Sequence, residues 1–206
     1  FVGPTQDPWR PTGKVLAYTG FEPGRDGFFF FNYSNVGSSL PNRMNKYVFG
    51  GNYSNVKNLG SQQMINLFGR RNVCAGHKKG KSNSCVLTLG AKAWMESVNR
   101  VSSGGHCFGI ATNAAQLFNR QLSQAQFGGR STTHSIPFKP ASTRPIAQAF
   151  SLQTLATSPT LQPRSAVKLL KRNLRPGHVP FTLSMRASGG GGHAVTPIAL
   201  SKTGKG

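Results

Sequence analysis

The chain has 206 residues, of which 25 are Lys or Arg and 4 are Asp or Glu, so its formal net charge at pH 7 is +21. This length accommodates one domain with a sizeable core, or at most two small ones. So few acids argue against a glycosidase carboxylate pair and an oxygen-ligand metal site, whereas the positive field attracts polyanions.

The N-terminal part, residues 1–58, is rich in Gly, Asn, Tyr and Phe and predicts a loop-rich segment ahead of a main domain over 59–206. The sequence Asn-Tyr-Ser-Asn-Val occurs in it twice, starting at Asn32 and at Asn52, and each copy contains an Asn-x-Ser glycosylation acceptor. No signal peptide is visible at the start, although a mature or trimmed chain has the same appearance. No apolar run approaches the ~20 residues that span a membrane.

Three helices are predicted in the middle of the chain. Apolar residues recur on one face over 61–68, where Ser61 can cap the helix and Gly69 ends it. A second helix is predicted over 89–101, and a third begins at or just after Cys107 and continues to about 122. Residues 128–164 are rich in Ser, Thr and Pro and predict a long connection or lid inserted into the domain.

The C-terminal part predicts a helix followed by antiparallel strands. A basic amphipathic helix is expected over 166–174. Strands are expected over 179–185 and 193–200, separated by a glycine-rich turn, with Pro197 typical of an edge or a bulge. Together these elements predict an α+β fold.

The three cysteines predict one bridge and one free thiol. Cys74 and Cys85 flank a polar, basic, glycine-containing stretch that is typical of an exposed loop. A disulfide here would contribute roughly 2–3 kcal/mol and would imply an oxidising compartment, hence export. The alternative, a metal site of Cys74, His77 and Cys85, lacks a fourth ligand and the usual close cysteine spacing.

The free thiol, Cys107, is a candidate nucleophile. It follows two glycines and opens an apolar helix, and a helix N-terminus favours a thiolate and offers free N–H groups to a developing oxyanion. A general base is also needed, and His193 is favoured among the five histidines because it opens an apolar strand after four glycines that leave room for substrate.

The stretch Gly104–Ala111 resembles the nucleophile segment of papain-like cysteine peptidases, and the run from Leu169 to Val195 resembles their histidine half, especially in the bacterial double-glycine-peptidase-like branch. The order agrees, since His193 follows Cys107 by 86 positions (193 − 107). Residues 58–122 also resemble uncharacterised exported bacterial proteins with a Gly-Gly-His-Cys centre.

The resemblance implies a papain-like fold, in which a central helix with Cys107 packs on a small antiparallel sheet with His193. It implies a secreted hydrolase that attacks a peptide or amide bond without metal or cofactor, or a related acyl transferase such as a transglutaminase. Gly105, His106 and Gly192 would shape the substrate cleft.

The sequence departs from the family at two functional positions. The family's oxyanion-binding Gln, six residues before the nucleophile, is Val101 here, and Asn99 is the nearest amide that could substitute. No Asn or Asp follows His193 to orient it. The chain is therefore a fragment, or the orienting residue comes from elsewhere, or the site is impaired.

Two other interpretations remain. Cys107 could be an ordinary buried cysteine, since free cysteines are among the most buried residues. The chain could also be a non-catalytic basic module for nucleic acid or an anionic cell-envelope polymer, with aromatic residues at 28–33 stacking on bases. No known nucleic-acid-binding motif is present. The cations of that module would be Lys78, Lys79, Lys81, Lys168, Lys171, Arg172 and Arg175.

Overall fold

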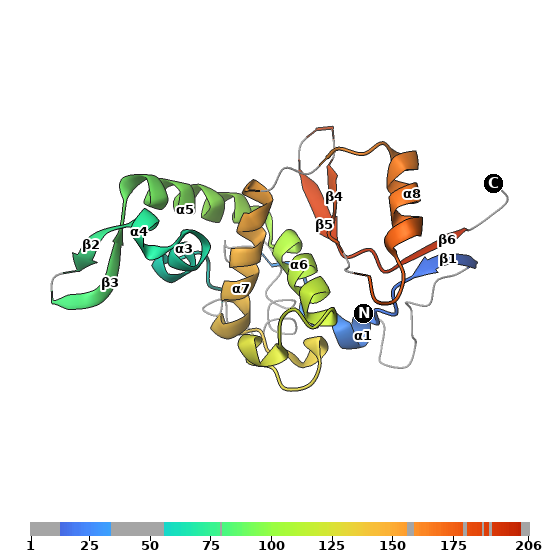
Figure 1. Cartoon of the computed structure of the whole chain (residues 1–206), viewed down its shortest axis with the longest axis horizontal. Coiled ribbons are helices and arrows are strands. Elements are labelled where there is room, and N and C mark those ends of the chain that lie inside the picture. The colour runs from blue at the N-terminus through green and yellow to red at the C-terminus, as the bar shows by residue number, and fades with distance from the viewer. Residues whose placement is uncertain are drawn as a thin grey trace, which may run out of the picture. The chain divides into compact units, whose positions relative to one another are not determined.

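The structure is a computed structural model that describes most of the chain, namely residues 13–33, 56–78, 80–155, 159–178, 181–186, 188–189 and 191–202. These residues form helices and three two-stranded antiparallel sheets (Figure 1), which confirms the predicted mixture of helices and antiparallel strands. The chain forms two compact units that are interleaved in sequence. The first comprises residues 1–29, 111–136 and 158–206, and the second comprises 30–110 and 137–157.

The first unit joins the two ends of the described chain. Strand β1 (Lys14–Tyr18) pairs antiparallel with β6 (Ala199–Lys202), and Thr19 N–H continues the pairing by donating to Ile198 O at 3.0 Å. The other elements of this unit are α1 (Pro23–Asp26), η3 (Gln124–Phe127), η4 (Thr133–Ser135), α8 (Pro163–Asn173), β4 (Leu183–Arg186), β5 (Gly192–Val195) and the last two turns of α6 (Cys107–Phe118).

The C-terminal strands differ from the prediction at Pro197. The single strand expected over 193–200 is two strands, because β5 ends at Val195 and β6 begins at Ala199. Proline has no N–H to donate to a neighbouring strand, so Pro197 interrupts the pairing. Before it, β5 pairs with β4, and after it, β6 pairs with β1. The strand expected over 179–185 is observed only in part, as β4, because residues 181 and 182 are not in the strand and 179 and 180 lie outside the described residues.

The second unit confirms two predicted helices, α3 (Ser61–Phe68) and α5 (Leu89–Val101). Helix α3 ends at Gly69, whose φ of +81° favours glycine, and Thr88 caps α5 by accepting a hydrogen bond from Ala91 N–H at 3.2 Å. The remaining elements are α4 (Arg70–Val73), β2 (Cys74–Lys78), β3 (Lys81–Leu87), η2 (Ser102–Gly104), the first turn of α6, α7 (Pro140–Ser151) and η5 (Leu152–Thr154).

Helix α7 lies where a long connection or lid was predicted. The Ser- and Thr-rich composition of 128–164 concealed it, because its hydroxyl groups are buried and satisfied within the helix start. Ser142 Oγ donates to Pro137 O at 2.6 Å and accepts from Lys139 N–H at 3.2 Å. Ile146 and Phe150 then supply the apolar face, at 0% and 5% exposure.

The core of the second unit fixes the start of α6. Leu59, Val98 and Phe150 form a buried cluster against which Phe108 of α6 packs. At the next position, a Cβ on Gly109 would collide with the carbonyl oxygen of Ile146 and lie 2.9 Å from Phe150 N. Only glycine therefore allows α6 to approach the backbone of α7 this closely.

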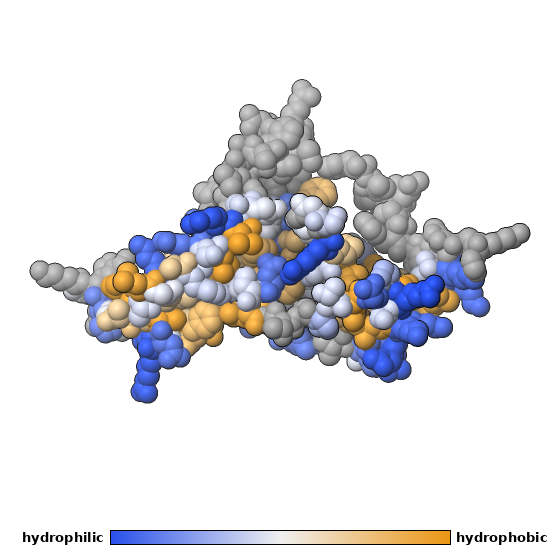
Figure 2. Space-filling model, turned by 90° about the horizontal axis from the view of Figure 1, so that it is seen from above, coloured by the Kyte–Doolittle hydropathy of each residue, from blue (hydrophilic) through white to orange (hydrophobic). Residues whose placement is uncertain are grey.

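The described surface mixes polar and apolar residues. In Figure 2 hydrophilic and hydrophobic areas alternate on the face seen from above. None of the described helices combines the length and the apolar character needed to cross a bilayer.

Candidate functional site

The structure confirms the predicted bridge and leaves one free thiol. Cys74 and Cys85 form a disulfide that joins β2 to β3, with their Cα atoms 5.3 Å apart. This pairing removes the thiolates on which the alternative metal site depended, and no group of three metal-ligating side chains occurs in the described parts of the chain. Cys107 is free and partly exposed, so it is not the sealed core cysteine of the alternative interpretation.

Cys107 is the first residue of α6. The first intrahelical bond runs from Ile110 N–H to His106 O at 2.9 Å. The N–H groups of residues 107–109 therefore have no acceptor within the helix, as at any helix N-terminus. The entry turn is made by Gly105, which is buried and has a φ of +131°. A thiol at this position lies beside donors that can stabilise negative charge.

An asparagine from a distant part of the chain completes this helix start. Asn32 Oδ1 accepts a hydrogen bond from His106 N–H at 2.6 Å, and a Cβ on Gly105 would lie 2.7 Å from the same oxygen. Because a backbone N–H can only donate, the amide atom that pairs with His106 N–H is the oxygen, and Nδ2 lies over Gly105 as its nearest neighbour there. Asn32 is an exposed residue, and its amide lies against the segment that leads into Cys107.

Sequence reasoning missed this role of Asn32. The repeated Asn-Tyr-Ser-Asn-Val marked the residue only as a glycosylation acceptor in a loop-rich segment. Nothing in one sequence indicates that its side chain reaches a backbone N–H 74 positions away.

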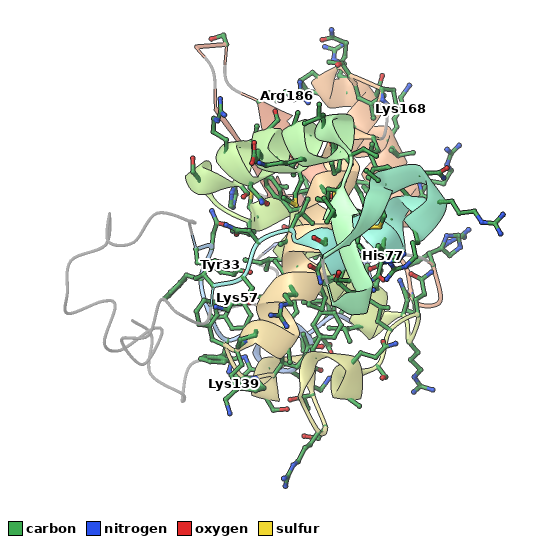
Figure 3. The ribbon with its side chains drawn as sticks, turned by 90° about the vertical axis from the view of Figure 1, so that its left-hand side faces the viewer. Tyr33, Lys57, His77, Lys139, Lys168 and Arg186 are labelled. Carbon is green, nitrogen blue, oxygen red and sulfur yellow. A yellow bond between two sulfur atoms is a disulfide. The ribbon has the colours of Figure 1, made fainter. Side chains whose placement is uncertain are left out.

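His106 is held inside the second unit. Its side chain is fully buried, its Nδ1 lies 2.9 Å from Tyr33 O, and its ring stacks on the Tyr33 ring at 4.4 Å (Tyr33 is labelled in Figure 3). The ring of Phe150 also packs near it, with the ring centroids 5.6 Å apart. Nδ1 is the donor to the carbonyl, which fixes the tautomer.

Burial sets the charge state of this pair. Desolvation lowers the pKa of His106, although its hydrogen bond to the Tyr33 carbonyl opposes the shift. Desolvation also raises the pKa of Tyr33 well above its usual value. His106 is therefore a neutral packing residue at pH 7, and its burial favours support of the helix start over the direct substrate contact that the sequence suggested.

The amide of Asn99 holds the backbone of Leu59. Its Oδ1 accepts from Leu59 N–H, and its Nδ2 donates to Leu59 O, both at 3.0 Å. These bonds tie the end of α5 to the segment before α3. The predicted oxyanion role of Asn99 stays a prediction, and the observed contacts favour a structural role.

His193 lies in the first unit, on the hairpin formed by β4 and β5. Its side chain is exposed, and it stands opposite Met185 in the ladder. Gly192 stands opposite Arg186, and a Cβ there would lie 2.7 Å from Met185 O, so this glycine allows close strand packing. The base and substrate-cleft roles predicted for these two residues stay predictions.

Within the first unit, α6 is tied to both ends of this hairpin. Thr196, which follows β5, donates from Oγ1 to Ala111 O at 2.9 Å. Thr182, which precedes β4, lies with its Oγ1 3.0 Å from Thr112 Oγ1. Ala111 is one helical turn after Cys107. The strands that carry His193 are thus bonded to the helix that begins with Cys107.

Cys107 itself belongs to the second unit and His193 to the first.

No protein-family model, curated protein or solved structure matches the chain.

Proposed function

We propose that the chain is a papain-like cysteine hydrolase in which Cys107 attacks a peptide or amide carbonyl. The observation that carries this proposal is a free, partly exposed thiol at the first position of α6, beside an exposed amide whose orientation is fixed. The sulfur forms a thioester and releases the amine, and water then hydrolyses the thioester to an acid.

Asn32 and the backbone N–H of Cys107 stabilise the oxyanion in this mechanism. The N–H at the start of α6 has no intrahelical acceptor, and the amide of Asn32, an exposed residue, supplies Nδ2 as a second donor beside the same segment. Two fixed donors are what a tetrahedral intermediate requires. Asn32 therefore takes the role that the sequence suggested for Asn99, whose amide is engaged with Leu59.

His193 is the general base in this proposal. It accepts the thiol proton, gives it to the leaving amine, and then accepts a proton from the attacking water. Its place on a hairpin bonded to α6 through Thr182 and Thr196 supports the assignment. Attack on the thioester by an amine in place of water would make the chain an acyl transferase. Product analysis with and without an added amine distinguishes the two reactions.

The disulfide supports an extracytoplasmic location in this proposal. Bridges of this kind persist in oxidising compartments and are rare in the cytosol. The substrate class is accordingly an extracytoplasmic peptide or protein.

The experiment compares two reactions of the same thiol. A p-nitrophenyl ester acylates a nucleophilic cysteine through an oxyanion, whereas iodoacetamide alkylates it without one. Intact-mass spectrometry of the full chain gives both rates, with alkylation measured at alkaline pH. Cys107→Ser should abolish both reactions. Asn32→Asp keeps the acceptor for His106 N–H but removes the donor, so acylation should fall by roughly 10²–10³ while alkylation changes little.

Asn66→Asp is the matched control, because it adds the same charge at another exposed asparagine of the second unit. It should leave the acylation rate within about twofold of the unaltered chain, as expected for a surface change. Two failures are distinguishable. A wild-type thiol that is alkylated but never acylated rules out the hydrolase. Equal acylation by the Asn32→Asp and Asn66→Asp variants rules out only the role of Asn32.

A further inference from the structure

Helix α8 carries four exposed cations on one side. Arg164, Lys168, Lys171 and Arg172 fall within about 100° of one another around the helix axis, at 3.6 residues per turn, and span about 12 Å along it. We call these four residues the α8 basic face (Figure 1 shows α8, and Figure 3 labels Lys168). The residues on the opposite side of the helix are less exposed, and these are Ala166, Leu169, Leu170 and Asn173.

No described carboxylate neutralises the α8 basic face. The helix contains no acid. The described acids of the first unit, Glu22 and Asp26, both pair with Arg25, at 3.1 and 2.8 Å. Lys168 is four residues from both Arg164 and Arg172, and like charges at this spacing destabilise a helix. The cations therefore form a local concentration of positive charge that the fold itself does not use.

We propose that the α8 basic face binds duplex nucleic acid through its phosphates, without reading the base sequence. A duplex carries one negative charge per ≈1.7 Å of axis, and its major groove, about 12 Å wide, admits an α-helix. The positive charge of the α8 basic face is opposite to that of the phosphate backbone. Its length of about 12 Å equals the length of duplex that carries several phosphates. This inference does not depend on the hydrolase proposal, because it involves neither Cys107 nor His193.

The distribution of apolar residues favours a duplex over a lipid bilayer. A helix that lies in a membrane interface turns its apolar side toward the lipid. In α8 the apolar side carries Leu169 and Leu170, which are half-buried, and the helix contacts β1. Val167, at 47% exposure, is the apolar residue left beside the cations. The exposed side of α8 therefore presents positive charge and, among apolar residues, Val167.

The test is a salt titration of DNA binding by the full chain. Anisotropy of a fluorescent DNA duplex gives Kd between about 50 and 200 mM salt, and the slope of log K against log salt is ≈ −0.9 per neutralised phosphate. Changing all four residues of the α8 basic face to Gln should reduce the magnitude of this slope by about 3 to 4. It should weaken binding at 0.1 M salt by roughly 1,000-fold.

The control changes four exposed cations outside α8 to Gln, namely Arg100, Arg130, Lys139 and Arg144. Both variants lower the formal charge from +21 to +17 (21 − 4), and the control should lose less than about tenfold in affinity and about one unit of slope. Far-UV circular dichroism checks that α8 persists, as expected because Gln is a good helix former.

Three outcomes would overturn the proposal. The duplex does not bind at low salt, or the two four-residue variants lose affinity equally, which would make the whole charge rather than α8 responsible. In the third outcome, vesicles containing phosphatidylglycerol bind more tightly than the duplex and depend on α8, which would make the face a lipid-binding surface.

Discussion

Two neighbouring residues at the start of α6 have opposite environments. Cys107 is free and partly exposed, whereas His106 is fully buried in contact with the rings of Tyr33 and Phe150. The buried ring and the Asn32 amide hold the backbone on one side of the thiol, so a reactive sulfur can be positioned by groups that do not themselves react. Placing a nucleophile on a rigid, supported element is what precise chemistry requires.

The burial of His106 predicts a pH-dependent stability. Its pKa is lowered in the fold, so between its folded value and about 6.5, the unfolded value, the unfolded chain binds more protons. The part of the unfolding free energy that comes from this lowered pKa is fully present above pH 6.5 and is lost as the pH falls toward the folded pKa. Urea unfolding should therefore show a lower free energy of unfolding at pH 5.5 than at pH 7.5, with part of the difference coming from this residue.

His106→Gln serves as the comparison, because it keeps a donor for Tyr33 O but does not titrate. The free energy of unfolding of this variant should change less between the two pH values. Few carboxylates add to the pH dependence, since the acidic residues of the chain are Asp7, Glu22, Asp26 and Glu96. Equal pH dependence in the two proteins would contradict the assignment of a neutral, buried His106.

Replacing Asn99 separates its structural role from a catalytic one. Asn99→Ala removes both hydrogen bonds to the backbone of Leu59, whose side chain is 5% exposed. Unfolding free energy should fall by about 1–3 kcal/mol, since buried backbone groups lose their partners. Unchanged stability together with lost acylation of Cys107 would instead support the oxyanion role predicted from the sequence.

A residue's role could be predicted from the sequence where the residues that determine it lie close together in the chain. The disulfide and the free thiol were predictable because three cysteines, two of them close together around a polar loop, allow few arrangements. The contact of Asn32 with His106 was not predictable, because it joins positions 74 apart and leaves no pattern in a single sequence.

At the scale of elements, the close approach of α6 and α7 depends on one glycine. Gly109→Ala should destabilise the fold by about 1–3 kcal/mol, because the added methyl group meets the backbone of Ile146 and Phe150. Gly90→Ala in α5 is the control: nothing lies within 4 Å of its Cβ position, and alanine favours helix there by up to about 1 kcal/mol. Thermal unfolding of both variants measures the difference. A neutral Gly109→Ala would mean that α6 and α7 are not this close.

Four helices were predictable from apolar periodicity: those over 61–68 and 89–101, the one that begins at Cys107, observed as α6, and the basic one over 166–174, observed as α8. The helices over 61–68 and 89–101 are observed with those bounds, although Gly60, and not the predicted Ser61, is the N-cap of α3. Helix α7 was missed because its composition is typical of a loop, and only the tertiary burial of Ile146 and Phe150 overrides that preference. The pairing of β1 with β6 was missed because it joins strands from opposite ends of the chain.

At the scale of the whole molecule, both units draw on separate parts of the sequence. The segment 111–136 belongs with the two ends of the chain, and 137–157 belongs with 30–110. No linear division at residue 58 would express this interleaving, and the predicted boundary there stays a prediction. Helix α6 contributes to both units, so the element that begins with Cys107 is also the one bonded to the hairpin of His193.

The central claim, a nucleophilic Cys107 served by His193, is tested by removing the imidazole and supplying it from solution. Wild-type chain should form a thioester at Cys107 with a p-nitrophenyl ester, and His193→Gly should slow this step by roughly 10²–10⁴, the usual contribution of a general base. Added imidazole should restore part of the rate in the variant alone. Acylation of Cys107 by the His193→Gly variant at the wild-type rate would contradict the account.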